Sequence, residues 1–123
     1  MDQQEIIEQY LEGWRIGNGV MSLQVTANEF TYDDPNTGII SRSKFLPFFN
    51  GFKQSVSEIT GKVSINPFLN YTDTVFDRKE LVWIVWCWWC AGETNFQGSA
   101  IIKVSKIGVL SEKIAYYSKL PKQ

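Results

Sequence analysis

The sequence predicts an α+β fold in which N-terminal helices pack on a sheet formed by the rest of the chain. Apolar residues recur at helical spacing up to Gly61, and strand-like segments separated by turn residues follow. Helices first and a meandering antiparallel sheet last is an α+β arrangement. With 123 residues, 44% of them hydrophobic and no internal repeat or linker, residues 1–123 are expected to form a single domain with its own core.

Three helices are expected. Asp2 with Glu5 three residues later is a capping box that starts the first helix, and Gly17 marks its end. Its apolar face consists of Ile6, Ile7, Tyr10, Leu11 and Trp14. A short helix could follow over 20–25. The third helix begins after Ser41 or Ser43, tolerates Pro47 in its first turn, and has an apolar stripe formed by Phe45, Phe48, Phe49, Phe52, Val56 and Ile59.

Strands are expected over 30–34 and then at five places after Gly61. These five are 62–65, 71–76, 81–91, 96–105 and 109–118, with turns at 66–67, 77–80, 92–95 and 106–108.

Asp34 ends the first of these strands, just before the breaker run 35–38. Alternate side chains of a strand share a face, so Asp34 goes with Phe30 and Tyr32, while Asp33 faces water. A carboxylate among aromatic rings is desolvated, its pKa rises from about 3.9, and it becomes a usable base. The alternative is structural, because an aspartate at this position often caps the following turn.

A loop at 92–95 fixes the register of the two longest strands. One face then pairs Trp89 with Gly98, Cys87 with Ala100, and Val85 with Ile102, all suited to a core or cavity. The other face pairs Trp88 with Ser99, Trp86 with Ile101, and Ile84 with Lys103. Large exposed apolar patches mark interfaces, so we expect a homodimer through a surface formed by Ile84, Trp86, Trp88 and Ile101.

Glu112 has two interpretations. A three-residue loop between the last two strands aligns it with Ile102, which makes it a second pocket carboxylate. The favoured interpretation is an exposed strand residue.

Several classes of function are excluded. A net charge of -1 gives no positive field for nucleic acid or anionic membranes. The N-terminus does not read as a signal peptide, and the apolar segment 81–91 is far shorter than the about 20 residues of a membrane span, so a soluble, cytoplasmic protein is expected. The chain has no histidine, and Cys87 and Cys90 point to opposite faces of a strand, which predicts no metal site.

Tyr10 on the first helix, Asp34 with Pro35 after the first strand, the Phe-rich helix and the final strands resemble the nuclear transport factor 2-like (NTF2-like) superfamily. Within it the chain is most similar to the SnoaL-like and ketosteroid isomerase-like branch. The resemblance covers nearly the whole chain. It implies a cystatin-like α+β barrel, in which a cone of curved sheet surrounds a pocket, helices close the wide side, and the protein is commonly a dimer.

The resemblance also implies roles for residues. Tyr10 matches the tyrosine of the isomerases' oxyanion hole, and Asp34 matches their catalytic aspartate. A second acid of that oxyanion hole is replaced by Ala100 in this chain. Losing one such donor costs roughly a hundredfold in rate, so steroid isomerisation is not expected.

Two hypotheses follow, with a third behind them. The first is a cofactor-independent isomerase, cyclase or dehydratase that acts on a small hydrophobic carbonyl compound, with Asp34 as base and Tyr10 as oxyanion donor. The second is a binding module for a small apolar ligand, and the third is a dimeric scaffold. The pocket-lining residues are expected to be Trp14, Phe30, Tyr32, Phe49, Trp83, Cys87, Trp89, Phe96, Ala100 and Ile102.

Overall fold

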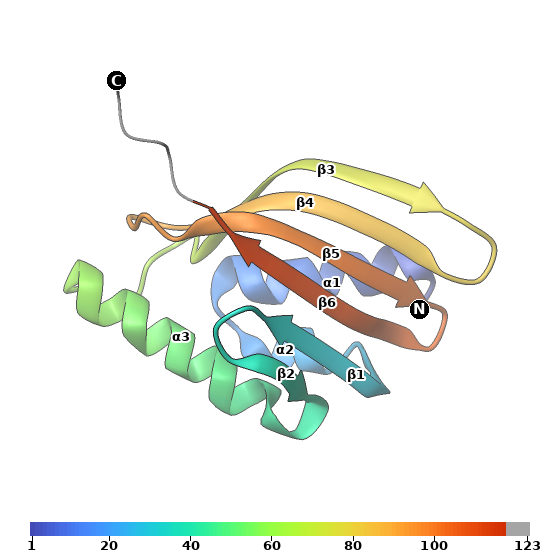
Figure 1. The fold of residues 1–123 in the computed structure, drawn as a ribbon, viewed down its shortest axis with the longest axis horizontal. Helices are drawn as coiled ribbons and strands as arrows, with labels where there is room; N and C mark the ends of the chain where they lie inside the picture. Colours follow the sequence, from blue (N-terminus) through green and yellow to red (C-terminus); the bar gives the residue numbers. More distant parts are fainter. Residues whose placement is uncertain (118–123) are drawn as a thin grey trace.

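The computed structural model describes residues 1–117, and they form helices packed on one mixed sheet (Figure 1). The helices are α1 (Gln3–Ile16), α2 (Gly19–Leu23) and α3 (Phe45–Thr60), with a short 3-10 helix at Arg42–Lys44. The strands are β1 (Thr26–Asp34), β2 (Gly38–Ser41), β3 (Leu69–Arg78), β4 (Trp83–Ala91), β5 (Gln97–Ser105) and β6 (Gly108–Tyr116). Their order across the sheet is β2-β1-β6-β5-β4-β3. The α+β prediction is confirmed.

Both ends of α1 are fixed by the residues that predicted them. The Asp2 carboxylate accepts a hydrogen bond of 2.8 Å from the amide of Glu5, and the Glu5 carboxylate accepts one of 3.0 Å from the amide of Asp2. Gly17 ends the helix in the left-handed region at φ 75°, which glycine adopts without steric cost. This places Tyr10 and Trp14, four residues apart, on the same buried face.

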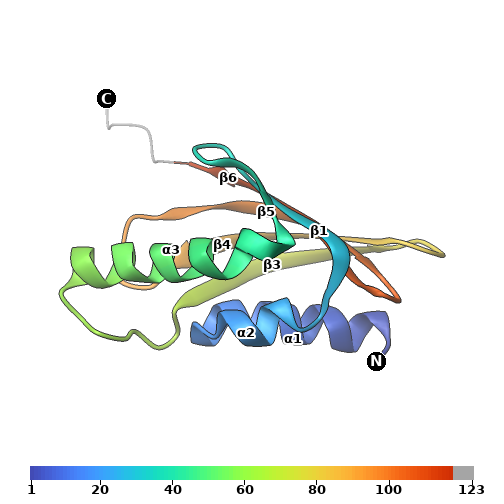
Figure 2. The ribbon, with the colours of Figure 1, turned by 90° about the horizontal axis from the view of Figure 1, so that it is seen from below.

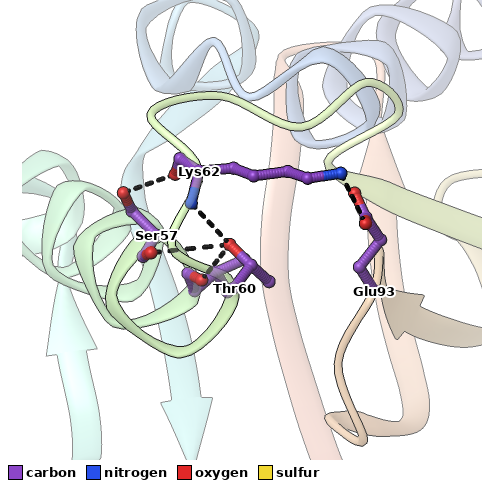
Figure 3. Close-up of polar contacts among 5 residues, drawn as sticks. Ser57, Thr60, Lys62 and Glu93 are labelled. Atoms are coloured by element: carbon purple, nitrogen blue, oxygen red, sulfur yellow. Dashed lines mark hydrogen bonds and ion pairs between the residues drawn. The ribbon is translucent and has the colours of Figure 1, made fainter.

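The C-terminal end of α3 is tied to the loop between β4 and β5 (Figure 3). Lys62 Nζ lies 2.7 Å from the carboxylate of Glu93 in that loop. Ser57 Oγ donates to the Lys62 carbonyl at 2.6 Å, and Thr60 Oγ1 accepts from the Lys62 amide at 3.3 Å. The ion pair is largely exposed and contributes little to stability. Together these contacts link the C-terminal end of α3 to the loop between β4 and β5.

Strands β3 to β6 form the expected antiparallel meander. Within it, every β4–β5 pair predicted from the loop at 92–95 is confirmed, including Cys87 opposite Ala100 and Trp86 opposite Ile101. The sheet is not antiparallel throughout, because β1 pairs in parallel with β6.

Two element predictions were wrong. Residues 62–65 form no strand; they belong to the connection that leads from α3 to β3, with Val63 and Ser64 exposed and no strand beside them to pair with. Strand β2 was missed, because the run 35–38 was interpreted only as a break. Gly38, at φ 88°, instead lets the chain turn back, so that Ile40 pairs with Tyr32.

A β-bulge lies near the start of β6. Val104 pairs with Val109, but the preceding residue of β5, Lys103, pairs with Ser111, which leaves Leu110 as the extra residue. Side chains of a regular strand alternate, so residues three apart would face opposite sides. Because of the bulge, Val109 and Glu112 are both buried on the helix side of the sheet.

The two faces of the sheet differ sharply. Helices α1 and α2 lie along one side of it (Figure 2), and the side chains that point there, such as Val85 and Cys87, are buried. On the opposite face Trp86, Trp88 and Ile101 are 48%, 40% and 44% exposed. Among residues 1–117, no helix has both the length and the apolar character needed to cross a membrane.

Candidate functional site

An aromatic pocket lies between the helices and the inner face of the sheet. Its walls come from α1, α3, β1, β3, β4 and β6, and we call it the inner pocket. Its lining residues are Trp14, Tyr32, Phe48, Phe52, Leu69, Tyr71, Trp89, Glu112, Ile114 and Tyr116. The cavity measures about 10 Å³, which is roughly the space that one water molecule requires.

Glu112 is the acidic residue in the wall of this pocket. The bulge at Leu110 turns its side chain inward, and it is 3% exposed, so the expectation that Glu112 is an exposed strand residue was wrong. Ile102 does lie opposite it, as the alternative interpretation required. Burial disfavours the charged carboxylate and raises the pKa of Glu112 to about 7, although the hydrogen bond from Tyr10 works in the opposite direction.

Tyr10 is the hydrogen-bond partner of Glu112. Its hydroxyl donates to Oε1 of Glu112 at 2.5 Å, the short distance typical of an O–H donor and a carboxylate. The tyrosine is fully buried, and burial first, then the nearby negative charge of Glu112, raises its pKa well above the ordinary value. Tyr10 therefore remains a donor at any ordinary pH and fixes the position of the carboxyl group.

Trp14 is fixed by the aromatic rings around it. Its side chain is 2% exposed, stacks on Tyr32 at 5.7 Å between ring centroids, and packs against Phe45 and Phe49. Its indole N–H is directed at the Tyr10 hydroxyl and lowers the pKa of that hydroxyl by hydrogen bonding, although the contact falls short of full hydrogen-bond geometry.

Asp34 faces the aromatic side, as strand parity predicted, and is 1% exposed. Its Oδ1 accepts hydrogen bonds from the amides of Asn36 and Thr37, at 2.7 and 3.0 Å, and so caps the turn between β1 and β2. Its Oδ2 accepts one of 2.7 Å from the hydroxyl of Tyr116. Both carboxylate oxygens thus have partners, and Asp34 is not part of the wall of the inner pocket.

A second, wider cavity, which we call the outer groove, lies next to the inner pocket. It has a volume of about 470 Å³ and is lined by Asn36, Phe52, Ser55, Asn95, Phe96, Gln97, Tyr116 and Tyr117. The rings of Phe52 and Tyr116 line both cavities and therefore stand between them. Tyr116 is held by Asp34 and packs edge-on against Trp89, with 5.5 Å between the centroids.

The structure distributes the pocket residues expected from the sequence over four places. Trp14, Tyr32 and Trp89 line the inner pocket, and Phe96 lines the outer groove. The residues that lie in the packed core, outside the lining of either cavity, are Phe30, Phe49, Cys87, Ala100 and Ile102. Trp83 is half-buried beside the guanidinium group of Arg78, whose central carbon lies 5.0 Å from its ring.

The cysteines are arranged as strand parity predicted. Cys87 points inward and is 1% exposed, whereas Cys90 is half-buried. Burial raises the pKa of the Cys87 thiol to about 12, so this thiol stays protonated. Within residues 1–117, no three His, Cys, Asp or Glu side chains come together as metal ligands.

Comparison with solved structures identifies proteins with a similar fold. No family model matches the chain, and no curated protein matches it. An NTF2-like protein of unknown function from Cytophaga hutchinsonii superposes with a TM-score of 0.63 and 8% identity, over 95% of this chain and 91% of the other.

Two further structures bear names that suggest an activity. One is described as a "putative ketosteroid isomerase" from Parabacteroides distasonis, with a TM-score of 0.67 and 9% identity over 97% of this chain and 90% of the other. Another is described as a "putative polyketide cyclase" from Xanthomonas campestris, with a TM-score of 0.64 and 12% identity over 94% of this chain and 90% of the other. At such identities the likeness shows the fold alone. The chain has the NTF2-like fold that its sequence resembles.

Proposed function

We propose that this protein binds a small hydrophobic carbonyl compound in the inner pocket, and that Glu112 exchanges a proton with the carbon next to the carbonyl. This would make it a cofactor-independent isomerase or a related lyase or cyclase. The observation that carries the proposal is the carboxyl group of Glu112, buried in an aromatic wall and bonded to the hydroxyl of Tyr10.

The acidity of Glu112 suits such a reaction. A general acid or base is most effective when its pKa lies near the working pH, and the pKa of Glu112 is about 7. The carboxylate takes a proton from the α-carbon, the C–H electron pair moves into the carbon–carbon bond, and the carbonyl oxygen gains the negative charge. The carboxylic acid then returns the proton to this carbon or to another one, so that no cofactor is consumed.

Glu112 takes the role that the sequence had suggested for Asp34. Asp34 uses both carboxylate oxygens to hold the turn and Tyr116, whereas Glu112 has one hydrogen bond, from Tyr10, and lines the cavity. Tyr10 in turn acts as a positioning residue for the base. Its hydroxyl is already engaged with Glu112, which argues against its direct use as the oxyanion donor.

The ligand would enter through the outer groove. With about 10 Å³ of free space, the inner pocket accepts a carbonyl compound only if rings in its wall turn aside. Phe52 and Tyr116 are the rings that separate it from the groove, which has about 470 Å³ available.

A second candidate is a binding module that performs no chemistry. The narrow inner pocket favours it, because a carbonyl compound larger than a water molecule must displace side chains before it reaches Glu112. In this case the ligand would be held in the outer groove, and its protons would not exchange.

Hydrogen–deuterium exchange separates the two candidates. Cyclohexanone and cyclohex-3-enone in D2O would be followed by NMR with the wild-type protein, with Glu112→Gln, and with Glu29→Gln as a control, because Glu29 is exposed on β1. We expect catalysed α-exchange that increases as the pH rises through about 7, where Glu112 becomes ionised, and that disappears in Glu112→Gln alone. Exchange that Glu112→Gln leaves intact would exclude Glu112 as the base.

A further inference from the structure

Two tyrosines in the wall of the inner pocket, Tyr32 and Tyr71, have hydroxyl groups without a hydrogen-bond partner among residues 1–117. We propose that these two hydroxyls donate the hydrogen bonds that hold the carbonyl oxygen of the compound bound in the inner pocket. The inference rests on the proposed function, because it assumes that a carbonyl compound reaches Glu112. It names the groups that would stabilise negative charge on that oxygen, a role for which the engaged hydroxyl of Tyr10 is not available.

The first argument is the state of the two hydroxyls. Neither is among the described buried polar atoms that are both unpaired and closed off from free space, so each oxygen keeps a surface that a ligand can reach. Tyr32 is 4% exposed and lines the inner pocket, so its free surface faces this cavity. Nearly all buried polar groups in folded proteins have a hydrogen-bond partner, and an exception calls for a specific reason. An oxygen of a bound molecule would be the missing partner.

The second argument is position. Tyr32 on β1 is paired with Glu112 on the parallel strand β6, and paired residues project side by side from the same face, with about 4.8 Å between the strands. Tyr71 reaches the same cavity from β3, the strand at the far edge of the sheet. An oxygen held between the two hydroxyls would therefore lie beside the Glu112 carboxyl group. Proton transfer next to a carbonyl requires this arrangement of base and oxygen.

Both tyrosines remain donors at any ordinary pH. Burial first, and then the negative charge of Glu112, raises the pKa of Tyr32 and of Tyr71 well above the ordinary value. A hydroxyl that stays protonated can donate to the neutral carbonyl oxygen and also to the oxyanion that forms when the α-proton leaves.

The third argument is the size of the free space. The inner pocket has room for about one water molecule, which is also the room that one carbonyl oxygen needs. A carbonyl oxygen has two lone pairs and so can accept from two donors at once. The oxygen would occupy the space that is already free, while the carbon skeleton of the ligand would need the further space that Phe52 and Tyr116 release when they turn aside.

The fourth argument is the chemistry of the ligand. A carboxylate would meet the negative charge of ionised Glu112, and the described residues that line the inner pocket include no lysine or arginine to offset it. An ammonium group has no lone pair to accept from the hydroxyls, and an alcohol lacks an acidic α-hydrogen. A neutral ketone, aldehyde or ester has the acceptor without the charge, so the three side chains favour a neutral carbonyl.

The test uses two probes of similar shape, cyclohexanone and methylenecyclohexane, which differ in having C=O or C=CH2. Dissociation constants of both would be measured for wild type, Tyr32→Phe, Tyr71→Phe and the outer-face control Trp88→Phe. We expect each tyrosine variant to bind the ketone roughly fivefold more weakly than wild type and to bind the alkene unchanged, whereas Trp88→Phe should change neither. In wild type, the ¹³Cζ resonances of Tyr32 and Tyr71 should move far more with the ketone than with the alkene.

The rate of α-exchange of cyclohexanone in D2O is a second measurement. Loss of one oxyanion donor costs roughly a hundredfold in rate, so we expect each tyrosine variant to exchange about that much more slowly than wild type. A tyrosine that only fills space would not produce this loss, because phenylalanine keeps the ring.

The outcomes separate this inference from the proposed function. If exchange depends on Glu112 but continues at the wild-type rate in either tyrosine variant, the inference is overturned and the proposed function survives. Equal responses of the ¹³Cζ resonances to the ketone and the alkene have the same meaning. That measurement is made on wild type, so it remains valid if a variant does not fold. If cyclohexanone does not bind at all, both the proposed function and this inference are overturned.

Discussion

Tyr10 and Glu112 are separated by most of the chain, yet the hydroxyl of one lies 2.5 Å from the carboxylate of the other. The contact joins α1 to β6 and places an acid in an aromatic wall. Its energetic consequence follows from the pKa of about 7, because the folded state binds the proton of Glu112 more tightly than an unfolded chain whose glutamate has a pKa of about 4.5.

The first prediction is a pH-dependent effect of Glu112→Gln on stability. Because folding raises the pKa of Glu112, its contribution to the free energy of unfolding is largest below pH 4.5. This contribution declines as the pH rises to about 7 and then stays constant, about 3 kcal/mol lower. Glutamine cannot ionise, so the free energy of unfolding of the variant should exceed that of wild type by up to this amount at pH 8 and by little at pH 4.5. Urea unfolding at both pH values measures the difference. Glu29→Gln should show no such change.

Removing the hydroxyl of Tyr10 should raise the pKa of Glu112 further. The hydrogen bond favours the carboxylate, so Tyr10→Phe leaves the charged form even less stable. We also expect the free energy of unfolding to fall by about 1–3 kcal/mol. Titration of the ¹³C-labelled carboxyl group provides the pKa. Tyr71→Phe is the control, since Tyr71 lines the same pocket without bonding to Glu112; an equal rise there would contradict the assignment.

Asp34 should matter for stability far more than its neighbour. Asp34→Ala removes the acceptor of two turn amides and of the Tyr116 hydroxyl, so we expect the free energy of unfolding to fall by about 2–3 kcal/mol. Asp33→Ala removes only an exposed pair with Lys113 at 3.8 Å and should cost less than about 1 kcal/mol. Chemical unfolding of both variants tests this. Equal losses in the free energy of unfolding would mean that the hydrogen bonds of Asp34 stabilise the fold no more than the exposed ion pair of Asp33.

The cysteines should react at different rates with a thiol reagent. Cys87 is buried and its pKa is raised to about 12, whereas Cys90 is partly accessible on the opposite face. Native protein should therefore be labelled at Cys90, and Cys90→Ala should react only on unfolding. Mass spectrometry after timed labelling reads this out. Prompt labelling of Cys87 would mean that the inner face of β4 opens readily.

We propose that two copies of the chain associate through the face of the sheet that lies opposite the helices. Trp86, Trp88 and Ile101 expose 48%, 40% and 44% of their surface side by side, which favours a homodimer there. Light scattering at micromolar concentration should give twice the mass of the chain, and Trp86→Lys should reduce it to the monomer. Val63→Lys, at an exposed position in the connection between α3 and β3, is the matched control. A wild-type monomer would exclude this interface.

The sequence predicted features that depend on neighbouring residues. Capping by Asp2 and Glu5, the end of α1 at Gly17 and the β4–β5 register are local, because each is set within a turn or a hairpin. The orientation of Glu112 was left open by the sequence. A three-residue loop that aligns it with Ile102 was the alternative interpretation, and this alignment is the one observed, although an exposed residue was favoured. The structure reaches this register through one unpaired residue in β6, which sequence periodicity does not reveal.

The bulge at Leu110 makes the register of β6, more than its composition, decide which chemistry faces the pocket. If Leu110 were paired with Lys103 instead of bulging out, the remainder of β6 would exchange its two sides: Glu112, Ile114 and Tyr116 would turn to solvent, and Ser111 and Lys113 would turn inward. A serine would then stand opposite Ile102, where the acid does now, and a lysine would be buried two residues further along. A one-residue change in register would invert the charge that this fold presents to its ligand, with every residue of the sequence unaltered.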